Sequence, residues 1–142
     1  MMDQPMSQPP EPGPGTGPRN CVVLLVEDHS DTRELLRRML TNRGHIVLAA
    51  SDCAAARAEA AEAVGRGQRV DVVIGDIGLP DGDGVDLMCD LKAALGCPAV
   101  ALTGHGMSED VRRCTEAGID RHLLKPVGVL ELDELIHRLA GC

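Results

Sequence analysis

Residues 70–84 read VDVVIGDIGLPDGDG, a short and largely apolar run that leads into an acidic residue and a glycine-rich segment. Apolar runs of this length are typical of a strand that is covered on both faces in a parallel sheet. We therefore predict a strand over Val70–Ile74, with Asp76 just beyond its carboxyl end. Pro80 and the glycines around it predict a turn before the next helix. Asp76 thus occupies the position at which open α/β sheets bind their ligands.

On both sides of this segment, short apolar runs alternate with longer amphipathic or alanine-rich stretches, as in α/β proteins with a parallel sheet. The other predicted strands are Val22–Val26, Ile46–Ala49, Ala99–Leu102 and His122–Leu124. The predicted helices lie around Leu35–Leu40, at Ala54–Val64, Val85–Leu95 and Glu109–Ala117, and around Leu132–Leu139. A glycine follows each helix, at positions 44, 65, 96, 118 and 141. Five such units predict a doubly wound, five-stranded parallel α/β sheet in the order 2-1-3-4-5.

The length and composition of the chain predict one folded domain. Residues 1–19 hold six of the nine prolines, so we predict a disordered tail or linker there and a folded domain over 20–142. The formal net charge of -8 argues against a nucleic-acid-binding surface. No apolar run approaches the ~20 residues that span a bilayer, and no secretory signal is recognisable. We therefore expect a cytoplasmic protein without a membrane partner.

Cysteine and lysine carry further information. The six cysteines include no C-x-x-C pair and lie in apolar or helical stretches, so we expect free and mostly buried thiols rather than zinc ligands or a disulfide scaffold. Lys92 and Lys125 are the only lysines, beside twelve arginines. A lysine in a chain that otherwise uses arginine is consistent with a need for a compact ammonium group rather than a planar guanidinium group.

Polar side chains stand at the carboxyl ends of four predicted strands. Glu27 and Asp28 follow the first strand, Asp76 the third, Thr103 the fourth and Lys125 the fifth. Because the first and third strands are neighbours in this order, the three carboxylates would face one another and repel unless a cation joined them. An oxygen-rich site with open positions suits Mg2+, which also shares oxygens with a phosphate. Lys125 could then pair with one phosphoryl oxygen, and Thr103 could donate a hydrogen bond to another.

Taken singly, these residues have ordinary structural explanations. Asp28 could cap the first helix, and Asp76 could belong to the turn before Pro80. Their occurrence together at four strand ends favours a site. The DGDG segment at 81–84 also suggests a calcium loop, but Val85 stands at the third ligand position and the closing glutamate is missing.

Four runs in the chain resemble the motifs of response-regulator receiver domains: LLVED at 24–28, DIGLPDGDG at 76–84, ALTG at 101–104 and LLKPV at 123–127. They occur in the order and at the spacing of that family, and the resemblance covers about residues 21–140. It implies the flavodoxin-like receiver fold and a place in a two-component phosphorelay. The stretches 76–84 and 103–127 are most similar to the receivers of hybrid histidine kinases.

The resemblance also implies a role for each residue of the acidic site. Asp76 would be the phosphoacceptor. Glu27 and Asp28, together with Asp76 and the backbone carbonyl of Gly78, would bind Mg2+. Lys125 would be the cation that pairs with the phosphoryl group.

Switch residues follow from the same resemblance. Thr103 would be the switch hydroxyl, and His105 lies just after it on a loop that should move with it. His122 stands three residues before the lysine, where receivers usually carry an aromatic switch residue, and could swing or titrate instead. The resemblance further implies a cis peptide bond between Lys125 and Pro126.

The implied function is a receiver that accepts a phosphoryl group from a sensor histidine kinase or a histidine phosphotransfer protein and changes the surface of its fourth helix, fifth strand and fifth helix. It would catalyse only its own phosphorylation and dephosphorylation. Two arrangements stay open, a free single-domain regulator and the terminal receiver of a hybrid histidine kinase. The alternative functions are a Mg2+-dependent phosphohydrolase or nucleic-acid-cleaving domain, which the acidic charge disfavours, and a receiver-like binding module that is never phosphorylated.

Overall fold

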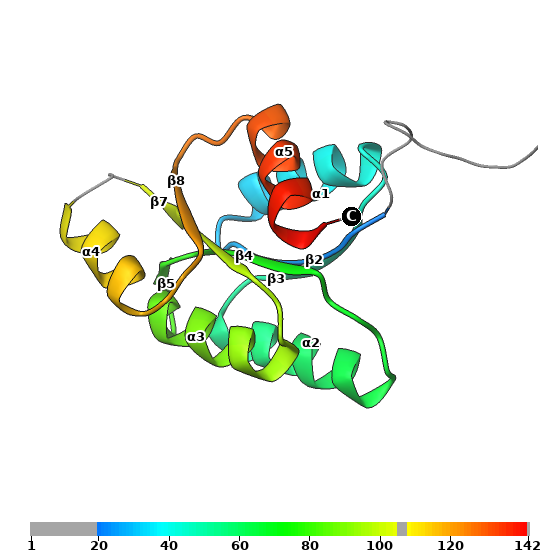
Figure 1. Cartoon of the computed structure of the whole chain (residues 1–142), viewed down its shortest axis with the longest axis horizontal. Coiled ribbons are helices and arrows are strands. Elements are labelled where there is room, and N and C mark those ends of the chain that lie inside the picture. Colours follow the sequence, from blue (N-terminus) through cyan, green and yellow to red (C-terminus); the bar gives the residue numbers. More distant parts are fainter. Residues whose placement is uncertain (1–19, 105–107, 142) are drawn as a thin grey trace, which may run out of the picture.

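A computed structural model of the chain describes residues 20–104 and 108–141. Its centre is a five-stranded parallel sheet in the order β3-β2-β4-β7-β8, which confirms the predicted order 2-1-3-4-5 (Figure 1). The tail predicted for residues 1–19 and the loop residue His105 lie outside the described residues. The strands are β2 (Val22–Val26), β3 (Ile46–Ala50), β4 (Val72–Asp76), β7 (Ala99–Thr103) and β8 (Arg121–Leu124).

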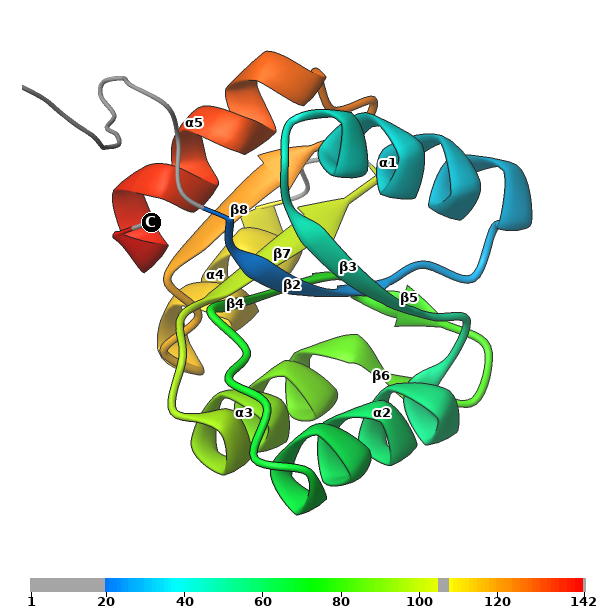
Figure 2. The same ribbon diagram turned by 90° about the vertical axis from the view of Figure 1, so that its right-hand side faces the viewer.

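Helices cover both faces of the sheet. Figure 2 shows α1 and α5 on one face and α2 and α3 on the other. α4 lies at the β8 edge, where Cys114 packs into the same core as α2 and α3. A helix lies in each connection between consecutive strands of the five-stranded sheet, which is how parallel strands are joined. The helices are α1 (Ser30–Asn42), α2 (Cys53–Gly65), α3 (Gly84–Leu95), α4 (Ser108–Glu116) and α5 (Val129–Ala140).

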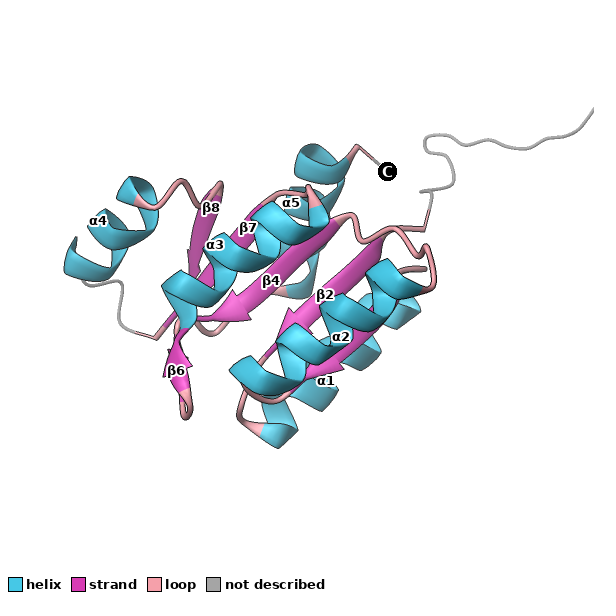
Figure 3. Ribbon diagram, turned by 90° about the horizontal axis from the view of Figure 1, so that it is seen from below, coloured by secondary structure: helices cyan, strands magenta, loops and turns pink. Residues whose placement is uncertain are grey.

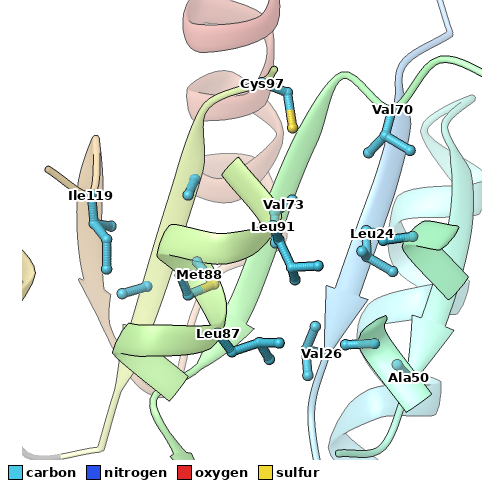
Figure 4. Close-up of a cluster of buried hydrophobic side chains, with 14 of the residues drawn as sticks. Leu24, Val26, Ala50, Val70, Val73, Leu87, Met88, Leu91, Cys97 and Ile119 are labelled. Atoms are coloured by element: carbon cyan, nitrogen blue, oxygen red, sulfur yellow. The ribbon is translucent and has the colours of Figure 1, made fainter. Parts of the chain in front are cut away.

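The strands send alternate side chains into two separate cores. In β2, Leu24 and Val26 belong to the core under α2 and α3, whereas Val23 and Leu25 belong to the core under α1 and α5. Figure 4 shows Met88 of α3 in the first of these cores, among aliphatic side chains. Because both faces of the sheet are buried, the central strands read as continuous apolar runs rather than as alternating ones.

A small antiparallel pair follows β4, where the sequence predicted only a turn. Its strands are β5 (Gly78–Leu79) and β6 (Gly82–Asp83). Between them, Asp81 accepts hydrogen bonds from the backbone N–H groups of Cys53 (2.8 Å) and Ala54 (3.1 Å) at the start of α2. The hairpin is therefore fixed to the amino-terminal end of that helix, where a carboxylate is stabilised.

Left-handed glycines end the helices as predicted at four of the five positions, namely Gly44, Gly96, Gly118 and Gly141. The prediction is wrong for Gly65, which is the last residue of α2. Gly67, two residues later, takes the positive φ (69°) instead.

Of the five cysteines that the structure describes, four agree with the prediction; Cys142 lies outside the described residues. Cys53, Cys97 and Cys114 are buried free thiols, and Cys89 is a half-buried one. Burial raises the pKa of Cys97 to about 11, so this thiol stays protonated and unreactive at neutral pH. Cys21 is disulfide-bonded, so the prediction of free thiols is wrong for this residue.

A buried charged network ties α5 to the connection between α1 and β3. His45 Nε2 lies 2.5 Å from Asp133 Oδ1, and Arg43 donates two hydrogen bonds to Asp133 Oδ2 (3.1 and 2.9 Å). His45 Nδ1 accepts from the Cys21 N–H (3.4 Å), so Nε2 carries the proton that Asp133 accepts. Burial acts to raise the pKa of Asp133, but the hydrogen bonds from His45 and Arg43 outweigh it and lower the pKa.

Asp133→Ala is expected to lower the free energy of unfolding by about 3 kcal/mol at neutral pH, because His45 loses its acceptor in a fully buried position. A carboxyl with a lowered folded pKa stabilises the fold above its unfolded pKa, about 3.9, and loses this contribution as the pH falls through the folded pKa. Urea unfolding followed by far-UV circular dichroism, repeated down to about pH 2.5, measures both effects. Glu134→Gln, at an exposed position of α5, is the control; parallel pH profiles for wild type and Asp133→Ala would contradict this account.

Candidate functional site

The carboxyl ends of the parallel strands lie together, and the predicted acidic and basic residues meet there. Glu27 and Asp28 directly follow β2, Asp76 is the last residue of β4, and Lys125 directly follows β8. These four residues and Gly78 line a common pocket of about 700 Å³. The structure therefore brings together residues that are up to 98 positions apart in the chain (125 minus 27).

Glu27 is fully buried at the base of this pocket. Its Oε2 accepts a hydrogen bond from the His29 N–H (3.1 Å), its backbone N–H binds Ala50, and its carbonyl accepts from Arg33. Oε1 lies 2.7 Å from Lys125 Nζ, an ion pair whose angles do not satisfy a hydrogen bond. A buried carboxylate oxygen without a hydrogen bond is costly, so this oxygen is suited to bind a cation.

Lys125 forms ion pairs with both Glu27 and Asp76. Its Nζ is 3.2 Å from Asp76 Oδ2, while Asp76 Oδ1 accepts a hydrogen bond from the Gly78 N–H (3.1 Å). Burial acts to lower the pKa of Lys125, but the carboxylates of Glu27 and Asp76 outweigh it and raise the pKa. The ammonium group is therefore charged at neutral pH. The peptide bond from Lys125 to Pro126 is cis, as the resemblance implied.

The three carboxylates have the spacing of a site for a divalent cation. One oxygen each from Glu27, Asp28 and Asp76 lies within 4.8 Å of the others. Oxygen ligands in an incomplete set suit Mg2+, which keeps several waters, and do not suit zinc, which favours nitrogen and sulfur. The residues of the pocket therefore fit Mg2+.

Thr103 ends β7 beside the acidic residues but is not part of the pocket lining. It is fully buried, and its hydroxyl donates to the Leu123 carbonyl over a long distance of 3.5 Å. Its own carbonyl accepts from the Lys125 N–H (2.8 Å), which links it to the other side of the site. His122 is exposed on β8, in register with Ala101 of β7.

Seven further residues line the pocket, and none of them was predicted as part of the site: His29, Thr32, Leu35, Leu36, Leu102, Pro126 and Val127. His29, rather than Asp28, caps α1, because its Nδ1 accepts a hydrogen bond from the Thr32 N–H (3.3 Å), and both His29 and Thr32 line the pocket. Leu35, in the predicted first helix, is 53% exposed and also lines the pocket. Histidine is not a preferred helix cap, so no sequence signal indicated this arrangement.

Known proteins are similar to this chain in sequence and in fold. The family model of the response regulator receiver domain matches residues 23–139. The transcriptional regulatory protein KdpE of Mycobacterium tuberculosis is 37% identical over 118 residues, which cover 83% of this chain and 49% of KdpE. The virulence sensor protein BvgS of Bordetella pertussis is 35% identical over 125 residues, which cover 82% of this chain and 10% of BvgS.

A solved structure with a bound metal ion is also similar. The receiver domain of the sensor histidine kinase PA1611 from Pseudomonas aeruginosa, with a magnesium ion coordinated in its active-site cleft, aligns with a TM-score of 0.72 and 28% identity. The alignment covers 87% of this chain and 99% of that domain. Two-component response regulator structures of lower identity share the fold.

The match covers most of this chain but only part of its relatives. The chain spans about half the length of KdpE and a tenth of BvgS. Among the helices of residues 20–104 and 108–141, none has the length and apolar character needed to cross a membrane. The family match, the relatives and the fold agree with one another. The chain belongs to the response regulator receiver family of two-component signalling systems.

Proposed function

We propose that Asp76 accepts a phosphoryl group from a phosphohistidine of a cytoplasmic sensor histidine kinase or histidine phosphotransfer protein, with Mg2+ bound beside it. The observation that carries this proposal is the position of Lys125 Nζ, which lies 2.7 Å from Glu27 and 3.2 Å from Asp76. An ammonium group in this place can neutralise the oxygens of a phosphoryl group on Asp76. The Asp76 side chain is 14% exposed, which leaves an oxygen accessible to the donor.

The proposed reaction is a displacement at phosphorus. One oxygen of Asp76 bonds to phosphorus while the bond from phosphorus to the donor imidazole nitrogen breaks, and the electron pair returns to the imidazole. The Gly78 N–H and Lys125 hold the carboxylate in position. Mg2+, held by Glu27, Asp28, Asp76 and the carbonyl of Gly78, would offset the charge of the phosphoryl oxygens. The chain catalyses its own modification and its reversal.

Thr103 is the proposed sensor of the phosphoryl group. Its 3.5 Å hydrogen bond to Leu123 is at the limit of a real bond, so its hydroxyl can exchange this partner for a phosphoryl oxygen at little cost. The exchange would draw the connection between β7 and α4 toward Asp76 and shift a pre-existing equilibrium of α4, β8 and α5. Two histidines are proposed to move with Thr103: His122, which stands in place of an aromatic switch residue, and His105, which follows Thr103 in the sequence.

Removal of the metal ion is expected to abolish phosphorylation. Incubation with acetyl phosphate and Mg2+ should add the mass of one phosphoryl group per chain, and peptide mapping should locate it on Asp76. With EDTA in place of Mg2+ the mass should not change, because the acidic trio repels the phosphate when no cation is bound. Equal labelling in Mg2+ and in EDTA would contradict the metal assignment.

The same preparation distinguishes the alternative functions. A Mg2+-dependent phosphohydrolase would release phosphate from a stable phosphomonoester in many turnovers, and a nucleic-acid-cleaving domain would cut DNA. A receiver does neither and gains a single covalent phosphoryl group. A chain that gains no mass from acetyl phosphate or from a phosphorylated kinase would instead be a receiver-like binding module.

A further inference from the structure

One ion pair connects α4 to the segment that follows the phosphoacceptor. Arg113, in the middle of α4, donates a hydrogen bond to Asp83 Oδ2 of β6. α4 lies at the β8 edge of the sheet (Figure 3), and Cys114 is its most buried described side chain. Arg112, next to Arg113, instead pairs with Glu109 and Glu116 of its own helix. Arg113 is thus the arginine of α4 that is bound to another element.

Asp83 is connected in turn to the phosphoacceptor through the β5–β6 hairpin. It stands opposite Gly78 in the antiparallel register. The Gly78 N–H binds Asp76 Oδ1 (3.1 Å). The other oxygen of Asp83 accepts from the Val85 N–H (2.9 Å) and caps α3, so the carboxylate is fixed from both sides. A continuous series of contacts therefore runs from Arg113 of α4 through the hairpin to Asp76.

We propose that the Arg113–Asp83 ion pair is a latch that holds α4 in the arrangement of the unphosphorylated protein and thereby slows phosphorylation of Asp76. The latch rests on the proposed function, because it opposes the movement of α4 that follows when Thr103 turns toward the phosphoryl group. Thr103 and α4 are joined by the short connection before Ser108, so a change at Thr103 acts on the helix that carries Arg113.

Thermodynamic linkage gives the direction and the size of the effect. An interaction made in one arrangement only lowers the population of the other, and its removal raises that population by the same factor. The Arg113 and Asp83 side chains are 38% and 36% exposed. Ion pairs that are this exposed stabilise one arrangement over another only modestly. We therefore expect loss of the pair to speed phosphorylation by about two- to five-fold.

The test compares the rate of phosphorylation by acetyl phosphate in Mg2+, followed by intact mass, for four proteins: wild type, Arg113→Ala, Asp83→Asn and the control Arg112→Ala. Asp83→Asn keeps a good helix cap while removing the charge. Arg113→Ala and Asp83→Asn should both be faster than wild type, whereas Arg112→Ala should match it. The rate increases of Arg113→Ala and Asp83→Asn should not add in the double variant, because both substitutions break the same interaction.

The charges of the variants distinguish loss of the ion pair from a general electrostatic effect on the donor. Arg113→Ala removes a positive charge near the site and Asp83→Asn removes a negative one, so a simple field effect on the anionic donor would change their rates in opposite directions. Opposite changes, or rates equal to that of Arg112→Ala, would overturn the latch while the proposed function stands. A wild-type chain that gains no phosphoryl group would overturn the proposed function and the latch together. Thermal melts of each variant confirm that it is folded.

Discussion

Asp76→Asn is expected to reduce the labelling by acetyl phosphate from one phosphoryl group per chain to none. The amide is nearly isosteric with the carboxylate and can still accept the hydrogen bond from the Gly78 N–H, so the fold should be unaffected. It lacks the anionic oxygen that must bond to phosphorus, and it cannot form the ion pair with Lys125. The measurement is intact mass after incubation with Mg2+ and acetyl phosphate.

Asp86→Asn is the matched control for this variant. Asp86 is an exposed carboxylate in the first turn of α3, outside the pocket lining. The control should be labelled as fully as wild type. If Asp76→Asn were labelled to the same extent, the phosphoryl group would reside on another residue and the site assignment would be wrong.

Gly84→Ala should destabilise the fold by about 3 kcal/mol or more, which corresponds to a fall in melting temperature of roughly 10 °C. A Cβ atom at Gly84 would lie 2.3 Å from the Ile77 Cα, 2.7 Å from the Ile77 carbonyl carbon and 2.5 Å from the Asp76 carbonyl oxygen. All three are backbone atoms, which cannot rotate away as the end of a side chain can. The backbone after β4 must shift instead, and phosphorylation should fall together with stability because Asp76 moves with it.

Gly65→Ala provides the comparison, since a Cβ atom there meets nothing within 4 Å and the residue has no left-handed φ. Alanine at the end of α2 should leave the melting temperature unchanged or raise it slightly. Far-UV circular dichroism is the suitable probe, because the chain contains no Trp, Tyr or Phe for fluorescence. Equal melting temperatures for the two variants would show that the backbone around Ile77 can move to accommodate a Cβ atom at position 84, and would contradict this prediction.

The strands and helices could be predicted almost completely, because each has a strong local pattern. The predicted strand Val70–Ile74 begins two residues later in the structure, at Val72, and β3 extends to Ala50. The β5–β6 hairpin was not predicted, since two-residue strands leave no periodicity to detect. Gly84 was assigned to the turn before the third helix, whereas its constraint is the close approach of the Ile77 backbone, which no local pattern reveals.

The sequence alone determined that Glu27, Asp28, Asp76, Thr103 and Lys125 would gather at one end of the sheet. The physical reason is that in a parallel sheet every strand ends on the same side, so the order of strands along the chain is enough to place these residues together. Only the tertiary structure decided how they interact. Lys125 pairs with both Glu27 and Asp76, and Thr103 binds Leu123. Such contacts depend on how separate segments pack to within a few ångströms, and local sequence patterns do not contain that information.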